Sequence, residues 1–187
     1  YPFEKFYEEG SGPGMDQPAG ALPFNREVFS DLLGGNQYFA ANFQGSNLTG
    51  SAAKGLAIVT CMDSRISPLD VVGMQSGDAK ILRNAGARVT EDVLRTLVLA
   101  TYLLGVNRIL IMPHTDCRMA GSDEADIHAT IADKYGVDTR RLEFRTVLNQ
   151  REALVTDVTR VRSDTLLRAA VKVGGRISTV PTGAVAT

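Results

Sequence analysis

The sequence predicts an α/β protein with a central, mainly parallel β-sheet that is flanked by helices and preceded by an N-terminal helical arm. From residue 56 onward, short apolar runs alternate with segments of helical periodicity. The run at 108–112 is almost continuously apolar, which is typical of a central parallel strand covered on both faces. Chemically reactive side chains follow two of these runs, where open parallel sheets place their ligands.

Composition narrows the class of protein. A chain of 187 residues suits one domain, or one domain plus an appendage, and can bury a sizeable core. The 20 basic and 21 acidic residues nearly cancel, so no basic field exists to attract nucleic acid or an anionic membrane. The longest apolar run, 97–104, is far shorter than the roughly 20 residues that cross a bilayer. We therefore expect neither nucleic acid nor a membrane as partner.

Cysteine usage indicates the compartment. The chain has two cysteines, and a protein of this size does not need a disulfide for stability. Residues 1–9 also lack the basic start and apolar centre of a secretory signal. We expect a reduced, cytoplasmic protein, although the chain does not begin with Met and the removal of an earlier segment stays open.

Residues 1–54 are predicted to form an N-terminal arm with helices that packs on a partner subunit, and residues 55–187 to form the α/β domain. The segment 1–23 is rich in glycine and proline without sustained periodicity, yet carries aromatic residues that could dock on a neighbour. The segment 25–44 has helical periodicity interrupted by two glycines. One broken helix and two short helices fit this segment equally well.

The elements of the α/β domain follow in order. Helices are expected at 90–105, 122–135 and 150–162, and strands at 56–60, 79–83, 108–112, 142–147 and 169–173. Thr90 is the predicted cap of the first helix, with acidic residues in its first turn. The second half of that helix is apolar almost all round, so we expect burial between the sheet and a second subunit.

Two strand ends carry metal-binding residue types. Cys61 follows the first strand, and His114 and Cys117 follow the third. In an open parallel sheet these ends can lie side by side across the crevice. Two thiolates and one imidazole suit zinc and leave one tetrahedral position free, which is the mark of a catalytic site. Buried free thiols, or a disulfide between the two cysteines, remain open on spacing alone.

Asp63 and Arg65 follow the first cysteine at alternate positions. The default interpretation is a solvated surface ion pair. Alternatively, Asp63 lies against the metal or one of its ligands, and Arg65 keeps it ionised through a forked hydrogen bond. The second histidine, His128, falls within a polar helix and is predicted to be a surface residue.

Taken jointly, three motifs resemble the β-class carbonic anhydrases: Cys-x-Asp-x-Arg at 61–65, Arg-Asn-Ala-Gly at 83–86 and His-x-x-Cys at 114–117. The resemblance is close over 56–119 and loose to about residue 183. It implies one zinc ion per chain, held by Cys61, His114 and Cys117, whose bound hydroxide reversibly hydrates CO2 to bicarbonate and a proton. It also implies that Asp63 orients this hydroxide and Arg65 fixes Asp63, which makes 55–187 a zinc-binding catalytic domain. Family members associate as homodimers or dimer-based higher oligomers.

Two departures from the family pattern stand out. Many members have glycine where this chain has Arg118, and Pro181 falls in the expected final edge strand, where it cannot donate a ladder hydrogen bond. Two other functions remain open. One is hydrolysis of CS2 or COS on the same scaffold. The other is a non-catalytic zinc or redox-sensing module in which the two cysteines cycle between metal and disulfide.

Overall fold

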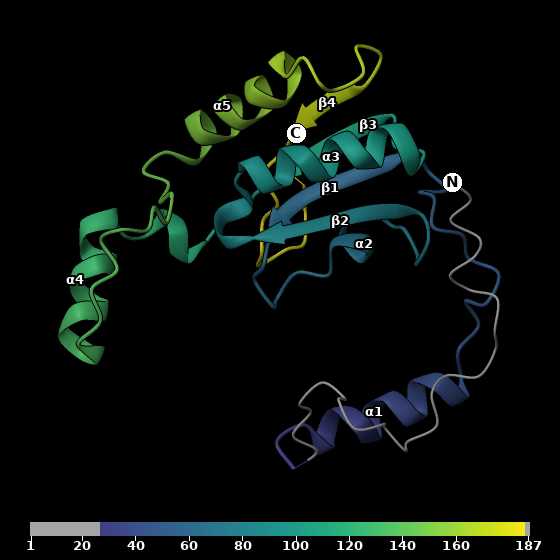
Figure 1. The fold of residues 1–187 in the computed structure, drawn as a ribbon, viewed down its shortest axis with the longest axis horizontal. Helices are drawn as coiled ribbons and strands as arrows, with labels where there is room; N and C mark the ends of the chain where they lie inside the picture. The colour runs from purple at the N-terminus through teal and green to yellow at the C-terminus, as the bar shows by residue number, and fades with distance from the viewer. Residues whose placement is uncertain (1–26, 186–187) are drawn as a thin grey trace, which may run out of the picture. The chain divides into compact units, whose positions relative to one another are not determined.

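The computed structural model of the chain describes residues 27–185 (Figure 1). The arm expected at 1–23, with its aromatic residues, lies outside the described residues. Contacts within the chain divide it into two units, one that ends at Ser46 and one that begins at Asn47. Each unit is described by itself. No helix within the described range is long and apolar enough to span a bilayer.

The described part of the first unit contains one helix, α1 (Ser30–Ala41). It runs through Gly34 and Gly35 without a break, so neither the broken helix nor the two short helices expected for this segment is found. None of its residues is buried, and its large apolar side chains are exposed. Since isolated helices of this length are marginal in water, α1 needs a packing partner.

The second unit is built on a sheet of four parallel strands, which confirms the predicted fold class (Figure 1). The strands are β1 (Leu56–Cys61), β2 (Ala79–Asn84), β3 (Arg108–Met112) and β4 (Lys172–Gly175), in the spatial order β2-β1-β3-β4. The two central strands, β1 and β3, pair in a register that sets Thr60 beside Met112. Their carboxyl ends therefore finish at the same level of the sheet.

Both faces of the sheet are covered. Val59 of β1 packs with residues of α3 (Glu91–Leu103) and α5 (Gln150–Ser163) in the larger core cluster. Its neighbour Ile58 belongs to a second cluster on the opposite face, beside the short helix α2 (Pro68–Val71). Because successive strand residues point to opposite faces, burial on both sides explains why the strands are apolar throughout.

Side-chain caps set the starts of two helices, and the predicted cap at Thr90 is confirmed. The Thr90 hydroxyl accepts a hydrogen bond from the backbone of Val93 at the start of α3. The helix α4 (Glu124–Tyr135) begins after Asp123, whose side chain caps it, and ends at Gly136 in the left-handed conformation at φ 67°. Glycine adopts this conformation without steric cost, so it terminates the helix.

One side of α3 is exposed within this chain. Leu99, Tyr102 and Leu103 are 47%, 56% and 61% exposed, respectively. The helix was expected to be buried on more than one side, but residues of this chain leave this side of α3 exposed. An exposed apolar strip of this kind marks a surface that another molecule can cover.

The strand predicted at 142–147 is wrong, because this segment forms no ladder with any strand. Its alternating apolar and polar residues match a strand pattern, but its backbone finds other partners. The Glu124 carboxylate accepts hydrogen bonds from the backbone N–H groups of Phe144 and Thr146, and Val147 donates to the Met119 carbonyl at 2.7 Å. A side-chain carboxylate thus replaces a neighbouring strand.

The last strand is shifted toward the C-terminus, since β4 covers Lys172–Gly175 and the predicted strand covered 169–173. Residues 168–171 form a turn, in which Val171 donates to the Arg168 carbonyl. After β4 there is no regular edge strand in the described chain, and Pro181 lies in a turn between isolated bridges at Ser178 and Val185.

The two glycines of β4 allow a sharp test of how α5 packs on the sheet. A Cβ atom at Gly175 would meet Leu154 Cδ1 at 2.7 Å and Val158 Cγ2 at 2.8 Å, whereas one at Gly174 meets nothing within 4 Å. We expect Gly175→Ala to lower the free energy of unfolding by about 1–3 kcal/mol through overpacking. Gly174→Ala is the matched control. Equal stabilities of the two variants in denaturant unfolding would contradict this packing.

Candidate metal centre

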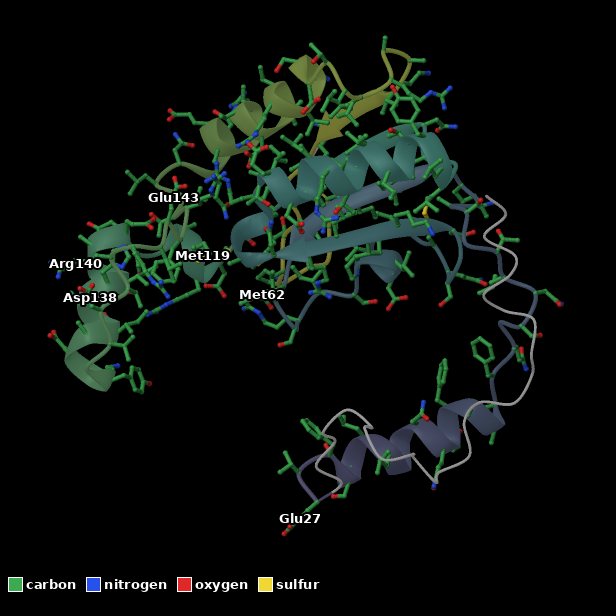
Figure 2. The ribbon with its side chains drawn as sticks, in the orientation of Figure 1. Glu27, Met62, Met119, Asp138, Arg140 and Glu143 are labelled. Atoms are coloured by element: carbon green, nitrogen blue, oxygen red, sulfur yellow. The ribbon has the colours of Figure 1, made fainter. Side chains whose placement is uncertain are left out.

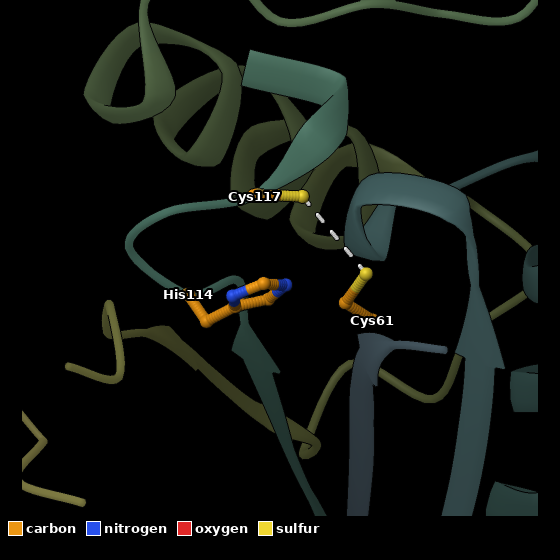
Figure 3. Close-up of side chains that lie close together, drawn as sticks. All are labelled: Cys61, His114 and Cys117. Carbon is orange, nitrogen blue, oxygen red and sulfur yellow. Dashed lines mark hydrogen bonds between the residues drawn. The ribbon is translucent and has the colours of Figure 1, made fainter. Parts of the chain in front are cut away.

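The structure brings together three side chains at the carboxyl ends of the central strands (Figure 3). Cys61 is the last residue of β1, His114 follows β3, and Cys117 precedes the short turn η3 (Arg118–Ala120). Their potential ligand atoms all lie within 4.8 Å of one another, and all three residues are buried. Within residues 27–185 this is the one group of His, Cys, Asp and Glu side chains arranged to hold a metal ion.

The spacing of the sulfur atoms fits zinc. Both cysteines are free thiols, and their Sγ atoms are 4.0 Å apart (Figure 3). Two sulfurs at about 2.3 Å from a tetrahedral zinc ion lie about 3.8 Å from each other. The observed separation is therefore close to that of two ligands on one ion.

His114 presents the correct nitrogen to this cluster. Its Nδ1 is 2.8 Å from the Thr115 carbonyl oxygen, so Nδ1–H donates and the lone pair resides on Nε2. Nε2 is fully buried and has no hydrogen-bond partner, and it is the single such side-chain atom in the described chain. An unpaired buried polar atom is costly. A metal ion bound to Nε2 removes that cost.

The electrostatics of the thiols also favour a cation. Burial raises the pKa of the Cys117 thiol above its ordinary value of 9.0, and the neighbouring Cys61 sulfur adds to the shift. Two thiolates side by side in an apolar pocket repel each other, and a divalent cation between them offsets both effects. Two sulfurs and one imidazole nitrogen leave a fourth position on a tetrahedral zinc.

Asp63 and Arg65 form a clamp beside the cluster. The Arg65 backbone N and Nε donate to Asp63 Oδ1 at 2.9 and 3.0 Å, and Nη2 donates to Oδ2 at 2.8 Å. These hydrogen bonds hold the pKa of Asp63 well below its ordinary value of 3.8. Asp63 Oδ2 is 3.8 Å from His114 Nε2. An ionised carboxylate therefore lies directly beside the position of a metal ion.

The sequence interpretation missed two residues around this clamp. Asp116 accepts from Arg65 Nη1 through its carboxylate at 2.7 Å and from Nη2 through its carbonyl at 3.0 Å. Arg83 donates to the carbonyls of Cys61 and Asp63 at 2.8 and 2.6 Å. The signal for Asp116 was its place inside the His-x-x-Cys motif. For Arg83 the signal is the motif at 83–86, which does not identify the carbonyl groups that its side chain binds.

The turn η2 (Ala85–Ala87) forms a wall next to the cluster. The Asn84 side chain closes it, donating to the Arg88 carbonyl at 2.7 Å and accepting from the Arg88 N–H at 2.8 Å. Gly86 has φ 79°, and a Cβ there would lie 3.2 Å from Met119 Cβ. Glycine is therefore favoured by the positive φ, and a side chain here would also be tight against Met119, which explains this part of the motif.

Arg118 fits the backbone conformation of its turn and points its bulk toward the exposed surface. It is exposed at the first position of η3, and it is not among the residues with positive φ. The left-handed residue of the turn is Asp116, at φ 54°. Glycine is therefore not needed at 118 in this chain.

His128, expected on the surface, is only partly exposed. Its side chain is only 15% exposed, its Nδ1 is 2.8 Å from Thr139 Oγ1, and its ring packs on Phe144. It helps to join α4 to the segment that follows. Figure 2 shows Glu143 of this segment between α4 and the rest of the second unit.

The fold and this site define a class of protein: an α/β protein with a catalytic-type Cys-His-Cys zinc site at the carboxyl edge of a parallel sheet. Comparison with known proteins identifies the family. Residues 56–185 match the carbonic anhydrase family. The chain belongs to the β-class carbonic anhydrases, zinc-dependent lyases that interconvert CO2 and bicarbonate, and the predicted family is confirmed.

Individual relatives agree with this assignment. The chain is 38% identical over 110 residues to β-carbonic anhydrase 1 of Mycobacterium tuberculosis, covering 59% of this chain and 67% of the relative. The crystal structure of the Streptococcus mutans carbonic anhydrase superposes with a TM-score of 0.80 at 31% identity, covering 88% of this chain and 98% of that one. A carbon disulfide hydrolase of Saccharolobus solfataricus is 37% identical over 93 residues, covering 50% of this chain and 45% of the relative.

Glu124 allows a prediction about pH. Its hydrogen bonds from the backbone of Phe144 hold its pKa below the ordinary value of 4.5. A carboxyl group with a lowered folded-state pKa stabilises the fold above its unfolded pKa, and this stabilisation disappears as the pH falls through the folded value. We expect Glu124→Gln to lower the melting temperature at pH 7, and this difference to shrink below about pH 4.5.

Asp133→Asn is the control for this experiment, because Asp133 is exposed on the same helix and its side chain makes no hydrogen bond or ion pair with residues 27–185. Thermal unfolding of the two variants and wild type from pH 3 to 8, a range that brackets the carboxyl pKa values, gives the comparison. A melting-temperature difference for Glu124→Gln that does not depend on pH would contradict a stabilising role for the ionised Glu124 carboxylate.

Proposed function

We propose that this chain catalyses the reversible hydration of CO2 to bicarbonate and a proton, with one zinc ion held by Cys61, His114 and Cys117. The observation that carries the proposal is the buried, unpartnered Nε2 of His114, which converges with two free thiols beside an ionised carboxylate. Membership of the carbonic anhydrase family supports the reaction.

Zinc, Asp63 and Arg65 have different roles in the proposed reaction. When bound, zinc supplies a Lewis acid that lowers the pKa of water to about 7, as in the carbonic anhydrases that hold zinc with three histidines, and so provides a nucleophile at neutral pH. Asp63 accepts a hydrogen bond from the attacking group and orients its lone pair toward the CO2 carbon. Arg65 keeps Asp63 ionised and fixed through the bonds at 2.8–3.0 Å. We assign Asp63 and Arg65 as the catalytic pair.

A second function is hydrolysis of CS2 or COS at the same site. It is favoured by the similarity to carbon disulfide hydrolases, of which one is 44% identical over 64 residues. The chemistry of nucleophilic attack is alike for the three linear substrates, so the side chains around the cluster select among them. Turnover of CO2, COS and CS2 by the same preparation distinguishes the two functions.

Metal analysis combined with a CO2 hydration assay tests the main proposal. We expect one zinc ion per chain in the wild type, and loss of both zinc and hydration in Cys61→Ser, because a serine hydroxyl is a poor zinc ligand. Asp63→Ala should keep its zinc and lose about 10–100-fold in hydration rate. His128→Ala, a histidine outside the cluster, should keep both zinc and activity. Hydration that survives in Cys61→Ser would refute the ligand assignment.

We also propose that the protein is a homodimer or a dimer-based higher oligomer in the cytoplasm. Residues 1–54 serve subunit association and residues 55–187 carry the catalytic site. Two exposed apolar surfaces support this, one on α1 and one on the outer side of α3. The pair of reduced thiols is in keeping with a reducing compartment.

Sedimentation analysis tests the role of the α3 surface. We expect Tyr102→Glu, in the centre of the exposed α3 strip, to shift the wild-type oligomer toward smaller species, because a buried unpaired carboxylate is costly. Tyr135→Glu, at an exposed position of α4, is the control and should not change the mass. A wild-type protein that is monomeric at every concentration would overturn the proposal.

A further inference from the structure

The chain builds the same aspartate–arginine clamp twice. In the clamp at Asp138 and Arg140, the Arg140 backbone N and Nε donate to Asp138 Oδ1 at 3.0 and 2.9 Å, and Nη2 donates to Oδ2 at 2.7 Å. These are the same three bonds that join Arg65 to Asp63. Figure 2 shows the second clamp beside α4. The clamp thus also forms away from the cluster and does not by itself create a catalytic group.

The two clamps differ in what holds them to the rest of the chain. Within the described residues, the Arg140 side chain forms hydrogen bonds and an ion pair with Asp138 alone. Arg65 makes two further hydrogen bonds, from Nη1 to the Asp116 carboxylate at 2.7 Å and from Nη2 to the Asp116 carbonyl at 3.0 Å. Arg65 is therefore bound on both sides, by Asp63 and by Asp116.

Asp116 lies in the turn that carries two of the three cluster residues. It stands between His114 and Cys117 and has φ 54°, a left-handed conformation that aspartate and asparagine adopt more readily than most residues. The preceding Thr115 fixes this turn, because its N–H donates to the Ser178 carbonyl at 2.9 Å and its carbonyl orients His114. Asp116 thus presents its carboxylate from a firmly held backbone.

We propose that Asp116 is a positioning residue, which docks the Asp63–Arg65 clamp onto the turn that bears His114 and Cys117. The inference rests on the proposed function of the site. Arg65 and Asp116 are 46% and 76% exposed, so their ion pair contributes little to stability. Its effect is on geometry, because a displacement of about 1 Å of a catalytic group can reduce a rate by about 100-fold.

Replacement of Asp116 by glycine and by asparagine tests this role. Glycine adopts φ 54° without strain and keeps the backbone carbonyl contact, but removes the carboxylate. Asparagine keeps an oxygen that can accept from Arg65 Nη1. We expect Asp116→Gly to retain its zinc and lose about 10–100-fold in the kcat for CO2 hydration, and Asp116→Asn to recover part of that loss.

Asp138→Gly is the control, since it removes an aspartate that binds an arginine side chain away from the cluster. It should leave kcat unchanged and shift the melting temperature at least as much as Asp116→Gly. An unchanged kcat in Asp116→Gly, or an equal loss in Asp138→Gly, overturns the proposal. So does loss of zinc from Asp116→Gly, because Asp116 then supports the ligands and not the clamp.

A readout that does not use activity separates this inference from the proposed function. Proton exchange of the Arg65 guanidinium, followed by nitrogen-resolved NMR of the zinc-loaded protein, should accelerate in Asp116→Gly and stay unchanged in Asp138→Gly. Unchanged exchange in Asp116→Gly overturns the inference. If the wild type turns over neither CO2 nor CS2, the proposed function fails, while the exchange rates still decide whether Asp116 holds Arg65.

Discussion

The pairing of β1 with β3 is the constraint on which the site depends. The register places Thr60 beside Met112, and the buried Thr60 hydroxyl donates to the Met112 carbonyl at 2.7 Å. The two strands therefore end together, and Cys61 emerges next to the turn that carries His114 and Cys117. A slip of this register by one residue would move every strand side chain to the opposite face and separate the three donors.

The donors are held in place by bonds that do not involve the metal. Arg83 donates hydrogen bonds to the backbone carbonyls of Cys61 and Asp63. Gln150 donates to the His114 carbonyl at 2.6 Å. The Thr115 carbonyl orients the His114 imidazole. The cluster therefore concentrates an unpaired nitrogen and two sulfurs in a buried pocket that favours a cation. In such preorganised sites, metal binding and folding stability are thermodynamically coupled.

Much of the fold was predictable because its signals are local. The apolar runs of β1, β2 and β3, the Thr90 cap and the terminating Gly136 depend on neighbours in the sequence. The failure at 142–147 has a non-local cause, since the Glu124 carboxylate takes the backbone groups that a strand would have offered to a neighbour. The predicted last strand stopped before two glycines, whereas β4 includes both of them. Gly175 is glycine because α5 approaches too closely for a side chain.

For the site, the sequence by itself predicted which three residues converge at the edge of the sheet. The residue types of Cys61, His114 and Cys117 suit zinc. The Asp-x-Arg pairs at 63–65 and 138–140 both close through short-range bonds. Only the tertiary structure decided what else holds Arg65 in place, namely Asp116. The bond from Arg65 to Asp116 joins residues that are 51 positions apart. No local pattern encodes such a contact, because it exists only when β1 and β3 lie side by side.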